Sequence, residues 1–373
     1  MNLPTEYEEF VCHIKSNHDR LFELVAHESQ YDKHDFSFLW ADMLHFLELF
    51  PKSVQDLATI QRDMTIATEK VCKGASLQWL PWGKVLFCPA SNAVIPVVPS
   101  TVLSLLICGN SVVIAPSRRT LASVKHIIAI FKQCFQNWEK SISFSERGGR
   151  QAIAQFVEGR RVRLLWFQGD STHRSMVAQK CMDNSVDFIY EGSGNCLTII
   201  DYPDGTEKIA EAARTIVRAA MICRGQLCTT PRVVFIRHNC LKEFKEHLVT
   251  SASSILSHRK LVFCEHSADA IPANVLEEEH SDGRIYLITF ETKQEILNCL
   301  LNYRFGIQLA FFTDETSDSI IHLFSKINVS RYLFNVSPVF QRSAVAWGGY
   351  GFSGPNPVST LLNKSLRTVV VHE

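Results

Sequence analysis

The 373-residue sequence predicts an α/β protein in which parallel sheets are covered by helices on both faces. The first reason is a strand–helix–strand–helix order between residues 84 and 138, where short apolar runs alternate with longer helical patterns. The second is that the same alternation returns after residue 231. The third is composition, since 46% hydrophobic and 20% charged residues are ordinary for a globular chain long enough for two domains.

The N-terminal segment, residues 5–70, is predicted to form several amphipathic helices that pack on the main body. The clearest helix carries apolar residues three or four positions apart, which places them on one face: Phe36, Leu39, Met43, Leu47 and Phe50. We expect a scaffolding role for this segment. Residues 76–82 then have the composition of a strand or bridge that leads into Gly83.

The first strand–helix units follow Gly83 and are bounded by clear turn signals. In order, we expect a strand at 84–88, a loop at 89–93, a helix at 98–108, a stop at Gly109-Asn110, a strand at 111–115, a helix from 116–120 to about 138, a polar loop at 141–150 and a helix at 151–158. The glycine and asparagine are typical of a helix C-terminus. This segment therefore predicts one parallel sheet.

The remaining elements are predicted in the same way. Strands are expected at 162–167, 186–190, 232–236, 285–290, 307–313 and 332–335, with a short segment at 260–264, and helices at 175–182, 209–220, 240–256, 292–302 and 317–327. The final β run, Leu366–His372, has no partner nearby in the sequence. We interpret it as an exposed edge suited to docking on another subunit.

Composition and charge exclude several classes of function. Lys plus Arg and Asp plus Glu both total 38, so nothing predicts nucleic acid or an anionic membrane as a partner. The 14 His show no metal-binding spacing, and we expect no metal. The 12 Cys show no disulfide framework, which predicts reduced thiols in a cytoplasmic protein. The apolar stretch 95–115 is broken by Pro96, Pro99 and Gly109 and predicts a buried helix and strand, not a membrane span.

Cys228 lies in a tight turn between a helical run and a β-type run, where Gly225 breaks the helix. A thiol presented on such a loop is suited to nucleophilic attack on a carbonyl carbon. The alternative is a small buried hydrophobe, which on this segment alone is the commoner situation for a free cysteine. The rest of the chain decides between them.

Two polar turns follow predicted strands, where a doubly wound sheet places a ligand. The first is Gln168–Thr172, and the second is Glu191–Asn195, in which glycines allow close approach of backbone to a ligand. Each turn alone is weak support for a site, because glycine-rich turns are common.

The order of these signals resembles the aldehyde dehydrogenase superfamily from about Trp82 onward. Gly225-Gln226-Leu227-Cys228 matches the nucleophile motif GQxC outright. Weaker matches are the asparagine loop at Pro89–Asn92, the helix stop and strand at Gly109–Ser117, the FTGS turn at Phe167–Asp170, the ELGG turn at Glu191–Gly194, the NxxxGL stretch at Asn302–Ile307 and the FGGxxxSG stretch at Trp347–Gly354. Each alone is weak, but all of them in the family's order are a strong signal.

The resemblance implies an aldehyde dehydrogenase-like fold in three parts. These are N-terminal helices with a Rossmann-type dinucleotide-binding domain at 1–195, a shortened catalytic domain at 196–355 and an oligomerisation strand at 356–373. A homodimer or homotetramer is expected. The catalytic domain is called shortened because only 51 residues separate Cys228 from Glu279 (279 − 228 = 51).

The resemblance also implies covalent chemistry on Cys228. Its thiolate would attack an aldehyde or thioester carbonyl, and the Asn92 side-chain amide would stabilise the oxyanion together with the Cys228 backbone N–H. Glu191 matches the general base. The alternative for Asn92 is a turn-capping residue, and for Glu191 a solvated loop charge.

The implied cofactor is NADP(H) or NAD(H). The residues expected to contact it are Pro89, Ala90, Ala115, Ser117, Arg118, Arg119, Gly169, Asp170, Ser171, Gly192 and Glu279. Ala115 replaces the family's ribose-binding lysine and Arg118 an acidic residue, which favours a 2′-phosphate and thus NADP(H). Asp170 would be unfavourable beside a pyrophosphate unless it points away. Glu279 only faintly matches the family's ExFGP motif.

Three activities remain open. The Gly192-Ser-Gly-Asn195 turn and Ala115 favour reduction of an acyl thioester, with coenzyme A or an acyl carrier protein as partner. Glu191 favours the alternative, oxidation of an aldehyde to the carboxylic acid. A third possibility is a catalytically inactive family member that acts as a binding subunit.

Overall fold

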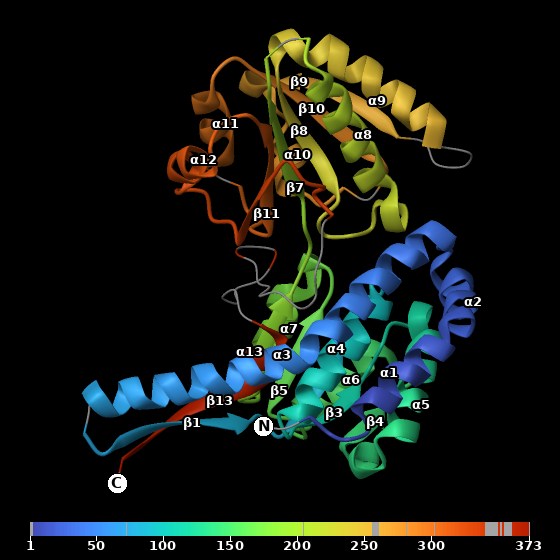
Figure 1. The fold of residues 1–373 in the computed structure, drawn as a ribbon, viewed down its shortest axis with the longest axis vertical. Helices are drawn as coiled ribbons and strands as arrows, with labels where there is room; N and C mark the ends of the chain where they lie inside the picture. The colour runs from blue at the N-terminus through green and yellow to red at the C-terminus, as the bar shows by residue number, and fades with distance from the viewer. Residues whose placement is uncertain are drawn as a thin grey trace. The chain divides into compact units, whose positions relative to one another are not determined.

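The computed structural model describes residues 3–71, 73–203, 205–255, 261–280, 282–301, 303–339, 350, 353 and 360–372. They form two compact units (Figure 1). Unit 1 holds the described residues within 1–190 and 358–373, and unit 2 those within 191–341 and 348–357. The three-part domain division made from the sequence stays a prediction.

The sheet of unit 1 has the strand order β4-β3-β2-β5-β6. Its strands are β2 (Lys84–Cys88), β3 (Ser111–Ile114), β4 (Ile142–Phe144), β5 (Leu164–Gln168) and β6 (Asp187–Glu191). β2 pairs in parallel with both β3 and β5, and β3 with β4. The chain thus moves outward to one side from β2 to β4 and returns to the other side at β5. This reversal makes the carboxyl ends of β2 and β5 a topological switch point.

Helices cover both faces of this sheet, as expected for a parallel sheet. The helices are α4 (Val94–Ile107), α5 (Leu121–Cys134), α6 (Gly148–Ile153) and α7 (Arg174–Asp183). Leu86 and Cys88 of β2 pack in a core with residues of α6 and α7. The alternate residues Val85 and Phe87 are equally buried on the other face. The predicted α/β fold class is confirmed.

The N-terminal helices pack on α4 and α5 and do not join the sheet. They are α1 (Tyr7–Ser16), α2 (His18–Ser29) and the 39-residue α3 (Lys33–Val71). All five residues of the predicted apolar face are buried: Phe36, Leu39, Met43, Leu47 and Phe50. The amphipathic pattern therefore located this helix correctly.

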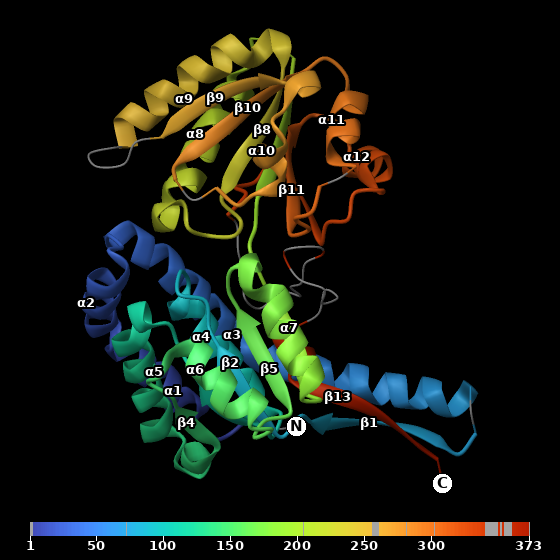
Figure 2. The ribbon, with the colours of Figure 1, turned by 180° about the vertical axis from the view of Figure 1, so that it is seen from behind.

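The second half of α3 runs beside a two-stranded sheet that extends from unit 1 (Figures 1 and 2). This sheet pairs β1 (Ala75–Pro81) antiparallel with β13 (Leu366–His372), so that Leu77 is opposite Val370. The short helix α13 (Leu361–Lys364) precedes β13. The last strand thus has a partner within the chain, which lies 285 residues earlier (366 − 81 = 285) and which no local pattern reveals. Its proposed docking on another subunit stays a prediction.

Asn110, predicted only as a helix stop, joins three segments of unit 1. Its buried side chain accepts a hydrogen bond from Gly83 N (3.1 Å) and donates to Leu105 O (3.0 Å) and Ser365 O (2.8 Å). One amide therefore closes the end of α4 and fixes the approach to β13.

Unit 2 contains a six-stranded, entirely parallel sheet with the order β12-β11-β7-β8-β10-β9. The strands are β7 (Cys196–Asp201), β8 (Pro231–Arg237), β9 (Val262–Ser267), β10 (Arg284–Phe290), β11 (Gln308–Thr313) and β12 (Arg331–Phe334). The helices are α8 (Glu207–Met221), α9 (Leu241–Ile255), α10 (Ala273–Glu277), α11 (Lys293–Leu300) and α12 (Ser317–Phe324).

Alternate residues of β8 show how both faces of this sheet are covered. Val234 and Ile236 pack in a core with α8 and α9, whereas Val233 and Phe235 pack in a second core with α11 and α12 (Figure 2). A strand buried on both faces reads as a continuous apolar run, which is why 232–236 was recognised.

Two short strands were not predicted. β4 lies within the segment expected to be a polar loop, and β7 follows the Glu191–Asn195 turn without a break. β4 has only three residues and a mixed sequence, so its neighbour β3 decides its conformation. β7 is a largely apolar run of six buried residues that the sequence analysis overlooked. Among the described helices, none combines the length and apolarity that a membrane crossing requires.

Candidate active site

Cys228 lies on a loop, residues 222–228, that we call the nucleophile loop. It begins with the tight turn η5 (Ile222–Gly225), in which Cys223, Arg224 and Gly225 all have positive φ angles of 50°, 57° and 66°. Only glycine adopts this conformation without cost. The turn stops α8 and reverses the chain, which leaves Cys228 half-buried just before β8.

The nucleophile loop packs against the turn Glu191–Asn195, which we call the glycine turn. The contact is made by Gly194, where a Cβ atom would lie 2.7 Å from the carbonyl carbon of Cys228 and 2.8 Å from Ile307 Cδ1. No residue other than glycine fits there without displacement of a neighbour. The two turns therefore lie side by side in unit 2. Their joint role in one catalytic site, which the resemblance implies, stays a prediction.

Ser353 and Asn195 fix the rest of the glycine turn. Gly192 N donates to Ser353 O (3.0 Å), and Ser353 Oγ donates to Ser193 O (2.9 Å). The Asn195 amide donates to Val275 O (2.9 Å) and Glu278 O (3.1 Å). Asn195 thus holds the segment that leads to Glu279.

Glu279 lies at the same place. Its Oε1 accepts a hydrogen bond from Gly194 N (3.2 Å) and is 3.6 Å from Arg232 Nη2. The faint ExFGP match therefore located a carboxylate beside the nucleophile loop. Its contact with a cofactor remains a prediction, as does that of Gly192.

Arg232 was missed by the sequence analysis. Only 1% of it is exposed, yet it lies second in β8, among apolar residues. Its guanidinium donates to Gly194 O (2.9 Å), Gly225 O (3.0 Å) and Leu227 O (3.2 Å). An arginine inside an apolar strand, directly after a nucleophile motif, is the signal that could have found it, because arginine is almost never fully buried without partners.

Burial and charge together set the protonation of Cys228. Burial is the largest effect and raises the pKa of its thiol from 9.0 to about 12. Glu279 raises this pKa further and Glu191 does so more weakly, whereas Arg232 and Arg331 lower it. The thiol is therefore protonated at neutral pH, and reaction requires a base or a change in its surroundings.

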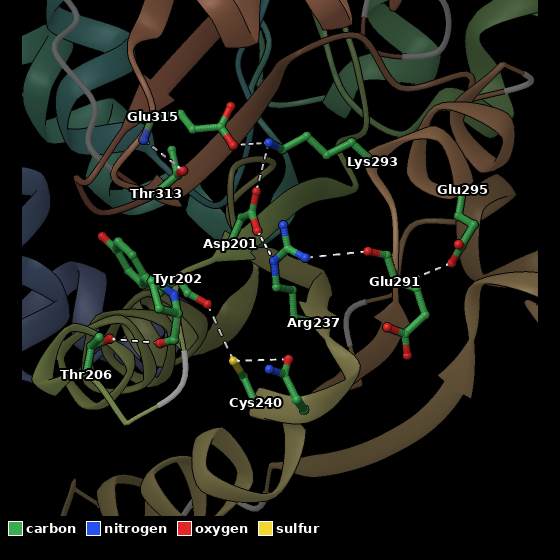
Figure 3. Close-up of polar contacts among 12 residues, drawn as sticks. Asp201, Tyr202, Thr206, Arg237, Cys240, Glu291, Lys293, Glu295, Thr313 and Glu315 are labelled. Atoms are coloured by element: carbon green, nitrogen blue, oxygen red, sulfur yellow. Dashed lines mark hydrogen bonds and ion pairs between the residues drawn. The ribbon is translucent and has the colours of Figure 1, made fainter.

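The opposite, carboxyl edge of the same sheet is filled by an ion network (Figure 3). Asp201, at the end of β7, is paired with Arg237 at the end of β8 and with Lys293 Nζ (3.0 Å), which also pairs with Glu315. Arg237 Nη1 reaches Glu291 O (3.5 Å). Each of these charges has an opposite charge beside it, so the network stabilises the ends of the strands. The candidate nucleophile is at the amino edge.

In unit 1, the predicted cofactor residues gather at the switch point. Ala90 N donates to Gln168 Oε1 (3.2 Å), which brings the loop after β2 next to the end of β5. Pro89, Gly169 and Ser171 lie in the same two loops. Asp170 caps the turn η4 (Ser171–His173), since its Oδ1 accepts from Thr172 N (2.7 Å). Its carboxylate is therefore directed to a backbone N–H of its own turn, and its contact with a cofactor stays a prediction.

The remaining predicted residues of unit 1 flank this crevice. Ala115 is buried at the end of β3, and Ser117 caps the turn η1 (Arg118–Thr120) by accepting from Arg119 N (3.3 Å). Arg118 and Arg119 are both exposed. A groove of about 590 Å³ on α6 is lined by Arg147, Gln151, Ala154 and Gln155. Whether this groove contributes to a cofactor site stays a prediction.

Asn92 lies in unit 1, where its carbonyl accepts a hydrogen bond from Tyr31 Oη (2.9 Å). Its predicted pairing with Cys228 stays a prediction. Of the other motifs, Asn302 and most of Trp347–Gly354 lie outside the described residues. Among the described residues, no group of His, Cys, Asp or Glu could hold a metal ion.

The sequence profile described as the aldehyde dehydrogenase family matches residues 8–261. The chain belongs to this family. The aldehyde dehydrogenase family 7 member B4 of Arabidopsis thaliana is 30% identical over 182 residues, which are 48% of this chain and 35% of the plant protein. The matched segment thus spans about a third of that relative.

Several solved structures share the fold, and each matches nearly the full length of this chain. Aldehyde dehydrogenase 21 of Physcomitrella patens, in complex with the product succinate, has a TM-score of 0.81 at 18% identity and covers 99% of this chain and 85% of its own. A glyceraldehyde-3-phosphate dehydrogenase of Methanocaldococcus jannaschii, complexed with NADP, has a TM-score of 0.80 at 14% identity. The match covers 100% of this chain and 91% of that protein. A candidate methylmalonate-semialdehyde dehydrogenase of Sinorhizobium meliloti, complexed with NAD, has a TM-score of 0.78 at 14% identity. The match covers 99% of this chain and 84% of that protein. At these identities the likeness concerns the fold alone.

Proposed function

We propose that this aldehyde dehydrogenase family member oxidises an aldehyde to the carboxylic acid with NADP or NAD, through a thioester on Cys228. One observation carries the proposal: the loop of Cys228 packs on the glycine turn of Glu191, with a second carboxylate, Glu279, held at the same place. A thiol and carboxylates in one site supply a nucleophile and a base. The relatives described above, by name, also favour aldehyde oxidation over acyl-thioester reduction.

Each residue has a defined task in this reaction. Glu191 takes the thiol proton of Cys228 and passes it to solvent. The Cys228 sulfur forms a bond to the aldehyde carbon, whose carbonyl electrons move onto oxygen. Asn92 Nδ2 and the Cys228 N–H donate hydrogen bonds to that oxyanion, where one donor is worth roughly 3 kcal/mol. NADP or NAD, if bound by the predicted residues of unit 1, would supply the acceptor for the hydride that leaves the aldehyde carbon. Glu191 then takes a proton from water, which attacks the thioester and releases the acid and the Cys228 thiol.

NADP is the favoured cofactor. Ala115 provides no amine at the position of the family's ribose-binding lysine, and the exposed guanidinium groups of Arg118 and Arg119 suit a 2′-phosphate. The groove that contains Arg147 adds a further cation in the same unit. We expect the replacement of both Arg118 and Arg119 by Ser to weaken NADPH binding more than NADH binding.

Acyl-thioester reduction remains the second candidate because of the Gly192-Ser-Gly-Asn195 turn. In the structure, however, the amide of Asn195 is engaged by Val275 O and Glu278 O. A structural role accounts for this asparagine, which weakens its value as a mark of thioester chemistry. An inactive binding subunit is the third candidate.

One titration separates the three. NADPH and NADH fluorescence is followed with and without acyl-CoAs, and absorbance at 340 nm with aldehydes and NADP or NAD. Aldehyde-dependent reduction of the cofactor, lost at least 10³-fold in Cys228→Ala, supports the proposal. Thioester-dependent oxidation of NADPH contradicts it in favour of the second candidate. Absence of binding by either cofactor indicates the third.

We also propose that the chain forms a homo-oligomer through β13 and α3. The described part of these elements carries exposed apolar side chains: Ile60, Met64, Ile66, Val71 and Val370, the last of which is 54% exposed. Such a row is unusual on a monomer surface. Sedimentation velocity of the wild-type chain and of Val370→Lys tests this, and a wild-type monomer at micromolar concentration contradicts it.

A further inference from the structure

The fully buried guanidinium of Arg232 requires an explanation. Removal of such a charge from water is costly unless it is paired and hydrogen-bonded. All of its partners within the described residues belong to the candidate site: the carbonyls of Gly194, Gly225 and Leu227, and the Glu279 carboxylate at 3.6 Å. One side chain thus joins the glycine turn, the nucleophile loop and the carboxylate.

The nucleophile loop needs such support because its backbone is strained. Cys223 and Arg224 are left-handed without being glycine, a conformation that costs about 1–2 kcal/mol for each residue. The carbonyls that Arg232 binds, those of Gly225 and Leu227, lie directly after this turn and directly before Cys228. Without these bonds, the loop could relax and the thiol would change its position.

We propose that Arg232 is the positioning residue of this site, which holds the nucleophile loop on the glycine turn so that the Cys228 sulfur is presented to the substrate. The inference rests on the proposed function only in the identity of the substrate. Arg232 touches neither substrate nor sulfur in this account and acts through the backbone on either side of Cys228.

The charge of Arg232 adds a measurable signature. Four charged groups act on the Cys228 thiol: Glu279 and Glu191 raise its pKa, and Arg232 and Arg331 lower it. Loss of the positive charge of Arg232 leaves Glu279 without its nearest cation. The fraction of thiolate at neutral pH then falls, whereas simple loosening of the loop would expose the thiol and speed its reaction.

The same strand supplies a matched control. Arg237 ends β8, as Arg232 begins it, and pairs with the nearly buried Asp201, but it lies at the carboxyl edge of the sheet (Figure 3). The experiment uses four variants of the full chain: Arg232→Met, Arg232→Lys, Arg237→Met and Arg237→Lys.

The main readout is alkylation of Cys228 by iodoacetamide between pH 7 and 9, followed by peptide mass spectrometry. Amide exchange of residues 222–228, Tm, kcat and KM are measured on the same variants.

We expect Arg232→Met to alkylate about tenfold more slowly, as for a pKa raised by about one pH unit. Arg232→Lys keeps the positive charge, so we expect its rate of Cys228 alkylation to stay within about threefold of the wild-type rate. Amide exchange of residues 222–228 should rise about tenfold, because an ammonium group does not reproduce the hydrogen bonds of the planar guanidinium. Its kcat falls about tenfold with little change in KM. The Arg237 variants lower Tm and leave both loop readouts at wild-type values.

The inference is overturned if Arg232→Met has wild-type amide exchange in residues 222–228, or if Arg232→Lys has wild-type exchange and kcat. Faster alkylation of Arg232→Met together with raised exchange means that loosening of the loop outweighs the change in charge, and it supports the positioning role. Should Arg232→Met not fold, the Arg232→Lys outcome decides. Alkylation and exchange do not depend on aldehyde oxidation. If the protein has no dehydrogenase activity but its Arg232 variants show the expected changes in alkylation and amide exchange, the proposed function is refuted and the positioning role of Arg232 stands.

Discussion

At the scale of the residue, the state of the Cys228 thiol is the first concern. Its pKa of about 12 means that in the ligand-free protein a small fraction is ionised at neutral pH. A protonated thiol is protected from oxidation and alkylation. Activation must therefore come from a general base or from groups that arrive with the ligands, and Glu191 is the base that we propose.

Gly194 tests the packing of the two turns directly. We expect Gly194→Ala to lower the free energy of unfolding by about 3 kcal/mol and to displace Cys228, because a Cβ meets the Cys228 backbone and Ile307. Urea unfolding and the rate of Cys228 alkylation measure the two effects. The control is Gly149→Ala, whose Cβ would lie 3.9 Å from Cys88 Sγ and within helix α6, so it should not destabilise. If the two variants have the same free energy of unfolding and the same rate of Cys228 alkylation, Gly194 does not make the close contact between the two turns.

At the scale of the element, the sequence located strands and helices wherever the apolar period was long. α3 and β8 are examples, since each buries the side chains that its pattern predicted. β4 was missed because its three residues carry no pattern of their own, and β7 was missed although its Leu197–Ile200 run is largely apolar. The site divides in the same way: the motifs located Cys228 and the glycine turn, but Arg232 acts on Gly194 from 38 residues away, and no local pattern carries that contact.

Asn110 provides an element-scale test. Asn110→Ala removes three hydrogen bonds that close α4 and hold the residues before β13, and leaves the Ser365 carbonyl without this donor. We expect a loss of about 2–4 kcal/mol in the free energy of unfolding, measured with urea. Asn184→Ala, whose side chain makes one bond to Lys180 O (2.9 Å) at a part-buried site, should cost less than about 1 kcal/mol. A cost for Asn110→Ala as small as that of the control would count against its joining role.

At the scale of the whole molecule, buried thiols couple stability to alkaline pH. Burial raises the pKa of Cys88, Cys108 and Cys181 from 9.0 to about 12. The folded state then holds protons that the unfolded chain releases between pH 9 and 12, so stability is full below pH 9 and falls as pH rises. We expect a slope steeper than about 1 kcal/mol per pH unit between pH 9.5 and 10.5 in urea unfolding. Cys181→Ala should flatten that slope, and an unchanged slope would be evidence against the effect.

The pairing of β1 with β13 has a consequence for how the chain is made. The ribosome must add 285 residues after Pro81 before Leu366 exists (366 − 81 = 285). At about 5–20 residues per second this takes roughly 15–60 s. Throughout that time β1 is outside the ribosome with an open edge, while the parallel sheet of unit 2 is synthesised. A nascent chain that carries an unpaired strand for so long is a natural client for a chaperone, and slower translation after residue 81 should increase the share of chains that aggregate.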